Sequence, residues 1–233
     1  MSNTSNKRIR AQYDKLSDRY DNLLAAQSRW SKLACKIVWG FPDTSYTERL
    51  LTYLPDDFGG SLLDVPVGTG LFTCGKYLRI PNARITCLDY SEGMLNTAKE
   101  RFSAAGIRNV VFMQGDIGGL PFEDASFDAV LSMNGFHAFP RKDAAAGELY
   151  RVLKPGGLFI GCFYIKGETR RTDWFIRRIY VPGGWFTPPF MTKRELTDRL
   201  KSMYSEAEVW NVGSIAGFRC VKQPTGIHMK GKV

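Results

Sequence analysis

The sequence predicts an α/β fold built on a doubly wound sheet of seven strands, mostly parallel, with an antiparallel hairpin at one edge. Three observations predict it. Short apolar strands alternate with helical patterns, an alternation that forces parallel pairing through crossover helices. The last two strands are separated only by Gly213-Ser214, a spacing that suits a tight antiparallel hairpin. The chain has 233 residues, enough for one domain with a full core.

The elements follow in order along the chain. A helical segment is expected over about 7–38, where Leu16, Tyr20, Leu23 and Leu24 form an apolar stripe. Helices are expected after Gly70, after Ser91 and over Asp143–Leu153, the last one ended by the Pro-Gly turn at 154–157. The five strands of this part are expected at Ser61–Val65, Arg84–Leu88, Val110–Met113, Phe127–Met133 and Leu158–Ile165.

The end of the chain has a different pattern. Residues 166–190 are dense in aromatic residues and arginines. A helix over Thr192–Met203 follows, and the strands Ala207–Val212 and Ile215–Val221 form the hairpin. The sheet is therefore mixed, with its antiparallel part at the edge.

Composition sets the class of protein. The hydrophobic fraction of 44% and charged fraction of 24% are typical of a globular chain. No apolar run approaches the roughly 20 residues that span a bilayer, and the N-terminal stretch lacks the apolar core of a secretory signal. The five scattered cysteines predict reduced thiols and a cytoplasmic location.

The net charge of +9 leaves two interpretations open. The first interpretation is an anionic partner, which could be nucleic acid, a membrane surface or an acidic substrate. The other is a solvated basic surface, which is favoured because the basic clusters are spread along the chain without a nucleic-acid motif. Nucleic acid is thus disfavoured as a partner, peripheral membrane contact stays an option, and the oligomeric state is not predicted.

The stretch SLLDVPVGTG predicts a ligand-binding turn at the end of the first strand. Gly68 and Gly70 have no Cβ, so the backbone there can turn sharply and a ligand can approach it. Asp89 ends the second strand 19 positions after Gly70 (89 − 70 = 19), where an acid can accept from both hydroxyls of a ribose. Thr73 stands where the NAD fingerprint requires its third glycine. Asp64 also argues against a dinucleotide, because its carboxylate suits a cationic ligand rather than a pyrophosphate.

Four stretches in order carry a family resemblance: LLDVPVGTG, CLDYSEGMLNTAKERF, QGDIGGLPFEDASFDAVLSMNGFHAF and ELYRVLKPGGLFIGCF. Together they resemble the motif series of class I S-adenosylmethionine-dependent methyltransferases with a Rossmann-like fold. Within this class, the small-molecule group of ubiquinone and menaquinone biosynthesis (methyltransferase type 11) is the most similar. The resemblance is continuous from about Ser61 to Tyr164, and AQYDKLSDRYD also resembles that group's N-terminal segment.

The resemblance implies S-adenosyl-L-methionine as cofactor, S-adenosyl-L-homocysteine as product, and a role for each matching position. Asp64 and the backbone of 66–70 would hold the methionine end, and Asp89 the ribose. Contacts around the adenine would come from Tyr90, Met94, Asp116 and Ile117. The backbone near Met133 and Asn134 would line the cleft under the sulfonium, and Tyr13 and Tyr20 would close over the cofactor.

Pro66 replaces the first glycine of the family's turn. Proline lacks the backbone N–H but keeps its carbonyl. A cationic amino group needs acceptors, so Pro66 is compatible with the cofactor if its φ lies near −65°.

The chain is predicted to form a single domain, with an N-terminal helical cap at 1–58, a cofactor-binding core at 59–165, a substrate lid at 166–190 and a C-terminal helix and hairpin at 191–233. The lid is expected because residues 166–190 are rich in aromatic residues and directly follow the fifth strand. The lid's aromatic residues, together with Phe136, are candidates for binding an apolar acceptor: Trp174, Tyr180, Trp185, Phe186 and Phe190. Plain packing is the alternative for this cluster.

His137 follows the fourth strand and is a candidate general base for a hydroxyl nucleophile, with a structural role as the alternative. No metal-ligand spacing is found, so no metal is predicted.

The predicted function is methyl transfer to a small, apolar or aromatic molecule. An RNA or protein methyltransferase that uses the basic surface, a NAD-dependent oxidoreductase and a non-catalytic cofactor-binding protein are the alternatives.

Overall fold

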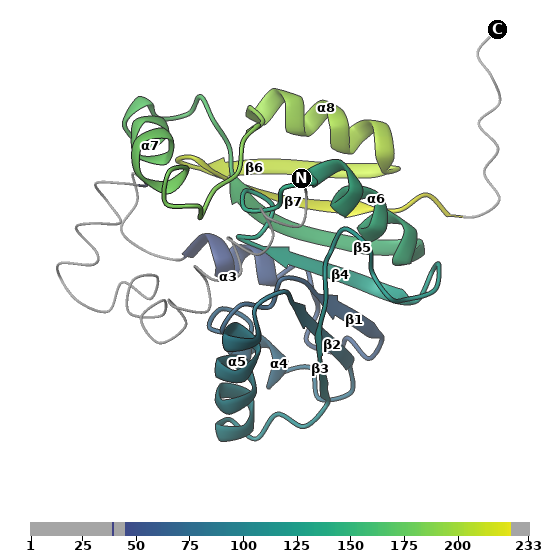
Figure 1. Cartoon of the computed structure of the whole chain (residues 1–233). Helices are drawn as coiled ribbons and strands as arrows, with labels where there is room; N and C mark the ends of the chain where they lie inside the picture. The colour runs from purple at the N-terminus through teal and green to yellow at the C-terminus, as the bar shows by residue number, and fades with distance from the viewer. Residues whose placement is uncertain (1–38, 40–44, 225–233) are drawn as a thin grey trace, which may run out of the picture.

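The computed structural model describes Trp39 and residues 45–224 (Figure 1). The predicted helical segment over 7–38, with Tyr13 and Tyr20, lies outside the described residues. The helices are α3 (Ser45–Leu51), α4 (Cys74–Tyr77), α5 (Glu92–Ala104), α6 (Lys142–Val152), α7 (Arg170–Phe175), the π-helix η1 (Ile176–Tyr180) and α8 (Lys193–Met203). The strands are β1 (Ser61–Asp64), β2 (Arg84–Asp89), β3 (Val110–Gln114), β4 (Phe127–Met133), β5 (Leu153–Tyr164), β6 (Glu206–Val212) and β7 (Ile215–Val221).

The described strands form one seven-stranded sheet in the order β3-β2-β1-β4-β5-β7-β6. The first five strands pair in parallel, and β7 is antiparallel to both β5 and β6. This confirms the predicted fold class, including the hairpin at the edge. In the part of the chain that is described, no helix is long and apolar enough to cross a bilayer.

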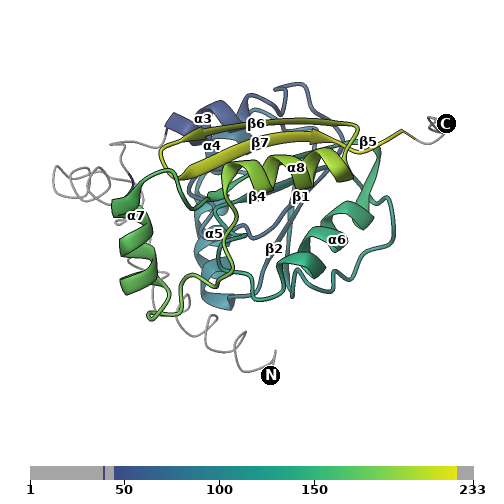
Figure 2. The same cartoon turned by 90° about the horizontal axis from the view of Figure 1, so that it is seen from above.

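Helices cover both faces of the sheet (Figure 2). Successive residues of a strand point to opposite faces, so Leu62 joins one core cluster and Leu63 the other. Residues of α3 and α5 fill the first cluster, and residues of α6 and α8 fill the second. The central strands β1, β4 and β5 are therefore largely buried on both sides, as parallel sheets require, whereas the edge strands β3 and β6 are partly exposed.

Helix starts follow the local sequence. The side chain of Ser91 accepts a hydrogen bond from the Met94 amide at 3.1 Å and caps α5. Thr192 and Glu195 form a capping box at the start of α8, which therefore begins at Lys193.

Two elements differ from the sequence prediction. The helix after Gly70 is a single turn, α4, because residues 71–73 form turns and Thr73 makes no side-chain cap. Strand β5 begins at Leu153, five residues before the predicted start. Its early part pairs Leu153 with Phe127, and the register shifts before Ala129, so the Pro-Gly stretch with Gly156 at a φ of +73° is an irregularity inside the strand.

Candidate functional site

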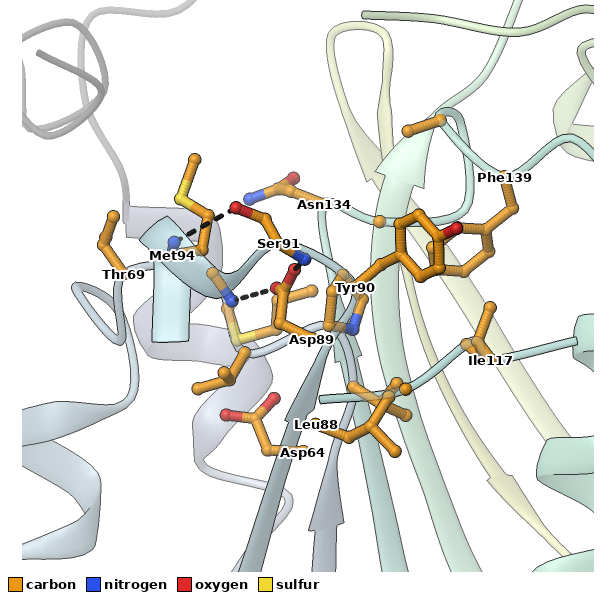
Figure 3. Close-up of a pocket in the computed structure, with 18 of the residues that line it drawn as sticks. Asp64, Thr69, Leu88, Asp89, Tyr90, Ser91, Met94, Ile117, Asn134 and Phe139 are labelled. Carbon is orange, nitrogen blue, oxygen red and sulfur yellow. Dashed lines mark hydrogen bonds between the residues drawn. The ribbon is translucent and has the colours of Figure 1, made fainter. Parts of the chain in front are cut away.

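A cleft lies at the carboxyl edge of the sheet, between the ends of β1, β2 and β4 (Figure 3). Ligands of open α/β sheets bind at this edge, where the strand order reverses between β1 and β4. The lining residues are Asp64 to Thr69, Leu71 to Thr73, Leu88 to Ser91, Met94, Gly115 to Ile117, Met133 to Gly135, and Ala138 to Pro140. The structure thus brings together every predicted cofactor residue that it describes, except Gly70, which lies directly beside the lining.

The loop after β1 turns through two glycines in the left-handed region. Gly68 has a φ of +58° and Gly70 a φ of +69°. A Cβ on Gly70 would stand 2.4 Å from the Phe102 ring, so α5 can pack this closely only against glycine. Nothing lies within 4 Å of where a Cβ of Gly68 would be, which leaves that side of the loop open.

Pro66 packs against the loop after β4. A Cβ added to Gly135 would lie 2.3 Å from Cδ of Pro66 and 2.9 Å from the Phe139 ring. The proline ring therefore fills the space that Gly135 leaves, and the Val65–Pro66 peptide is cis. The neighbouring amide of Val67 is satisfied by the Leu88 carbonyl at 3.0 Å, so the proline costs the turn only its own N–H.

Asp89 connects two loops of the cleft. One carboxylate oxygen accepts from the Gly68 amide and the other from the Ser91 amide, both at 2.9 Å (Figure 3). Each oxygen of an ionised carboxylate has two acceptor positions. The side chain can hold the glycine loop in place and still accept from the hydroxyls of a ribose.

Asp64 is the deepest acid of the site, with an exposed fraction of 1%. Its Oδ2 accepts a hydrogen bond from the Tyr77 hydroxyl at 2.6 Å, whereas its Oδ1 is buried without a hydrogen-bond partner among the described residues. The pKa of Asp64 is raised to about 7, mainly by burial; the hydrogen bond from Tyr77 opposes the rise, and the nearby Asp89 carboxylate adds to it. A buried acceptor of this kind fits the cationic amino group of S-adenosylmethionine.

Asp116 lies after β3 on a tight turn. Its Oδ1 accepts from the Gly118 amide at 2.8 Å, and its Oδ2 pairs with Arg141 at 3.1 Å. Ile117 and Tyr90 lie at the same end of the cleft as Phe139 (Figure 3). This end offers apolar surfaces beside one carboxylate, which fits an adenine ring with its amino group.

The loop after β4 closes the other side. Asn134 has a φ of +53°, its amide donates to the Cys162 carbonyl at 2.7 Å, and its side chain donates to the Tyr46 hydroxyl at 3.2 Å. These contacts fix the backbone that follows Met133. The charged residues of the described lining are all aspartates, so the cleft has no cationic side chain of its own.

His137 and Phe136 leave this loop but do not line the cleft. His137 is buried and stacks on Phe186, with ring centroids 3.8 Å apart. Burial lowers the pKa of His137 to about 3, with a smaller contribution from the Lys142 charge. A histidine this acidic is a weak proton acceptor at neutral pH, so the geometry favours a structural role. Phe136 is buried against Phe163 at 5.3 Å.

The aromatic residues of 166–190 separate into two groups. Phe186 is buried and packs on Tyr164 and Tyr180, at 5.7 and 5.2 Å between centroids. Phe190 and Trp185 pack around this group. Trp174 is different, because 55% of its side chain is exposed. None of these rings is part of the described cleft lining, and their role toward an acceptor stays a prediction.

Two polar contacts connect this aromatic cluster to the loop after β4. The Thr187 amide donates to the His137 carbonyl at 2.9 Å. The Lys142 ammonium donates to the carbonyls of Phe139 and Thr187. Because Phe139 lines the cleft, the segment after η1 is tied to the cleft wall.

Several functional contacts were not predicted. Tyr77, which orients Asp64, lies thirteen positions after it with no motif to connect the two. Gly135, which receives Pro66, and Lys142, which ties two loops, were also missed. The sequence shows a proline in the glycine turn and a glycine after Asn134, but only the folded structure shows that these two residues are in contact. Among the described residues, no group of three potential ligands is placed to hold a metal ion.

Comparisons with known proteins agree with this site. Residues 62–157 match the family model described as a methyltransferase domain. The demethylmenaquinone methyltransferase of Symbiobacterium thermophilum is 32% identical over 225 residues, covering 85% of this chain and 83% of that protein. The enzyme of the same name from Bacillus cytotoxicus is 32% identical over 161 residues, 69% of this chain and 63% of that protein. The first three curated relatives are matched over only 40%, 63% and 58% of their own lengths.

Solved structures show the same fold at lower identity. A phosphoethanolamine N-methyltransferase of Haemonchus contortus, in complex with phosphomonomethylethanolamine and S-adenosylhomocysteine, has a TM-score of 0.68 at 18% identity, covering 91% of this chain and 60% of that one. The [4+2]-cyclase SpnF has a TM-score of 0.71 at 18% identity, covering 93% and 95%.

Proposed function

This chain belongs to the class I S-adenosylmethionine-dependent methyltransferases of the quinone-biosynthesis type, and we propose that it methylates a small, apolar or aromatic acceptor. One observation carries the proposal: the described cleft has three carboxylates and otherwise uncharged, mostly apolar lining. Such a site suits a cationic cofactor beside an acceptor without anionic groups, because an anion would meet like charge.

The three aspartates are proposed to hold the cofactor. Asp64 accepts from its amino group, Asp89 from the ribose hydroxyls and Asp116 from the adenine amino group. Tyr90, Met94 and Ile117 pack around the ring. When bound, S-adenosylmethionine supplies a methyl group made electrophilic by its sulfonium.

The acceptor is proposed to enter along the apolar part of the lining. This part includes Leu71 and Phe72 of the loop after β1 and Ala138 and Pro140 of the loop after β4. The relatives named demethylmenaquinone methyltransferases make a quinol-type ring the first candidate. A ring of this kind would bury its faces against these side chains.

The protein's contribution to catalysis is proposed to be alignment and the exclusion of water. Alignment of nucleophile and methyl group can remove roughly 7–11 kcal/mol of barrier. The described lining contains no histidine or lysine that could act as a base. An acceptor that enters as a neutral amine needs none, whereas a phenolic acceptor has to release its proton to solvent. His137 acts by supporting the wall of the cleft.

A labelled-methyl experiment tests this proposal. The full chain is incubated with S-adenosylmethionine labelled in its methyl group and, in separate reactions, with demethylmenaquinol (demethylmenaquinone kept reduced with dithionite), a simple apolar phenol, total RNA or protein extract. We expect label in the quinol or the phenol, and none with the Asp89→Ala variant. Label in RNA or protein with none in the small molecules would overturn the acceptor class. Cofactor binding by calorimetry without any methyl transfer would point to a non-catalytic protein.

A further inference from the structure

The helices α7 and η1 present one face to solvent. Along Arg170–Tyr180, six residues are exposed; five of them, Arg170, Arg171, Trp174, Arg177 and Arg178, fall at positions i, i+1, i+4, i+7 and i+8, and Ile179 follows at i+9. The spacing of the first five places them on a single side of a helical segment. Trp174 lies in the middle of four arginines with 55% of its side chain exposed, and Ile179 beside them is 44% exposed.

The opposite face fixes the segment to the fold. Thr172 and Ile176 are fully buried there, and Ile176 belongs to the main core cluster. Asp173, the only acid between residues 169 and 184, points inward: it accepts from the Tyr164 hydroxyl at 2.6 Å and the Gly167 amide at 3.0 Å. The inner face is therefore anchored in the core, and the outer face of this stretch carries its four arginines.

We propose that this outer face, Arg170, Arg171, Trp174, Arg177, Arg178 and Ile179, docks on an anionic lipid bilayer. The arginines match the phosphates of acidic headgroups in charge and geometry. Tryptophan has an apolar body and a polar N–H, the combination that favours the bilayer interface. Ile179 gains only from apolar surroundings, which a lipid interface provides and a nucleic-acid backbone does not.

Comparison with the other exposed apolar residues supports this choice. Leu78 and Val111 are the other large apolar side chains that the described surface exposes. Arg79, next to Leu78, is paired with Asp56. No arginine flanks Val111 directly. Within Trp39 and residues 45–224, only the α7–η1 face combines exposed apolar side chains with a cluster of four arginines.

The face lies at the functional edge of the molecule. Helix α7 begins six residues after the carboxyl end of β5, so it stands on the same edge of the sheet as the cleft (Figures 1 and 2). Docking through α7 would bring that edge to the lipid surface. Binding to a bilayer needs no acceptor, so this inference goes beyond the proposed function and can be tested without it.

Vesicle co-sedimentation tests the inference on the full chain. Vesicles of phosphatidylcholine alone are compared with an equimolar mixture of phosphatidylcholine and phosphatidylglycerol, with neither cofactor nor acceptor present. We expect salt-sensitive binding to the mixed vesicles only. The Arg170→Glu/Arg178→Glu variant should bind at least about thirtyfold more weakly, since each basic residue near an anionic surface contributes about fivefold. Trp174→Ala should also bind more weakly and lose the blue shift of tryptophan emission.

Matched controls keep the test specific. Arg84 and Arg108 are exposed arginines at the amino edge of β2 and β3, so Arg84→Glu/Arg108→Glu makes the same change in net charge away from the face. This control and Leu78→Ala should bind vesicles like the parent chain. Equal losses in the face and control variants, absence of binding to mixed vesicles, or binding of RNA but not of vesicles would each overturn the proposal. Each variant should bind S-adenosylhomocysteine with the affinity of the parent chain, which verifies that it is folded.

Discussion

The two halves of the cleft edge are built by different physical means. After β1, β2 and β3, each turn carries an aspartate, and Asp89 and Asp116 each bind a backbone amide two residues further on. After β4 and β5, the contacts are between rings far apart in sequence, such as His137 with Phe186 and Tyr164 with Phe190. The first half depends on local hydrogen bonds and the second on tertiary packing. Mutations in the first half should therefore change cofactor affinity, whereas mutations in the aromatic half should change stability or turnover and leave cofactor affinity unchanged.

The largest expected effect is on the stability of the aromatic half. Phe186→Ala removes a buried ring that packs on His137, Tyr164 and Tyr180, and should lower the free energy of unfolding by about 3–5 kcal/mol. Urea unfolding measures it. Affinity for S-adenosylhomocysteine in the folded variant should stay the same. A decrease in the free energy of unfolding of less than about 1 kcal/mol would mean that the Phe186 ring packs loosely. That would contradict the view that tertiary packing holds the aromatic half together.

The next effect concerns Lys142, which connects the loop after β4 to the segment after η1. Lys142→Met keeps an apolar stem but removes the donor to the Phe139 and Thr187 carbonyls, at a cost of about 1.5–3 kcal/mol per charged hydrogen bond. We expect a raised KM for the acceptor with unchanged cofactor affinity in calorimetry. Lys154→Met, which removes a half-exposed partner of Asp128 at the opposite edge, is the control. Equal effects of the two variants would contradict a special role for Lys142.

The first half should respond to pH through Asp64. A cationic amino group beside this carboxylate favours its ionised form, so cofactor binding releases the proton that Asp64 holds below its pKa of about 7. Affinity for S-adenosylhomocysteine should fall by up to about tenfold per unit as the pH drops below about 7, and level off above it. Asp64→Asn should abolish the slope. The slope should shift to higher pH in Tyr77→Phe, which removes the hydroxyl that lowers this pKa. An unchanged profile in Tyr77→Phe would mean that this hydroxyl does not set the ionisation of Asp64.

The smallest effect is expected at Trp174. Its side chain is half exposed, so Trp174→Ala should change the free energy of unfolding by less than about 0.5 kcal/mol, in contrast to Phe186→Ala in the same connection. Urea unfolding of both variants side by side checks this. A loss comparable to that of Phe186→Ala would show that Trp174 belongs to the packed cluster.

The position of the first half of the cleft could be predicted from the sequence because its signals are local, while the roles of its residues toward a cofactor stay predictions. An acid at a strand end and glycines with positive φ have fixed spacing, and the cleft includes Asp64, Gly68, Asp89 and Asp116 as expected. The parallel pairing of the first five strands and the edge hairpin followed from the alternation of elements and from a two-residue turn. The length of the helix after Gly70 was not predicted. It is the single turn α4, and Thr73 at its start makes no side-chain cap.

The second half could not be predicted to the same depth, because its contacts join positions with no fixed spacing. The density of rings in 166–190 indicated a cluster, but not that Phe186 would stack on His137 while Trp174 faced solvent. The low pKa of His137 likewise results from burial that only the fold creates. Pro66 is compensated by Gly135, across about seventy positions of sequence, and no local rule connects them.

A paired titration tests the division between the halves most directly. Calorimetry of S-adenosylhomocysteine with Asp89→Ala and Trp185→Ala measures cofactor affinity, and methyl transfer to the acceptor measures turnover. Asp89→Ala loses charge-assisted hydrogen bonds worth roughly 1.5–3 kcal/mol each, so its affinity should fall by about a hundredfold or more. Trp185→Ala should keep the parent affinity and lose most of its turnover. Parent-like affinity in a folded Asp89→Ala variant, or an equal loss of affinity in both variants, would contradict the account.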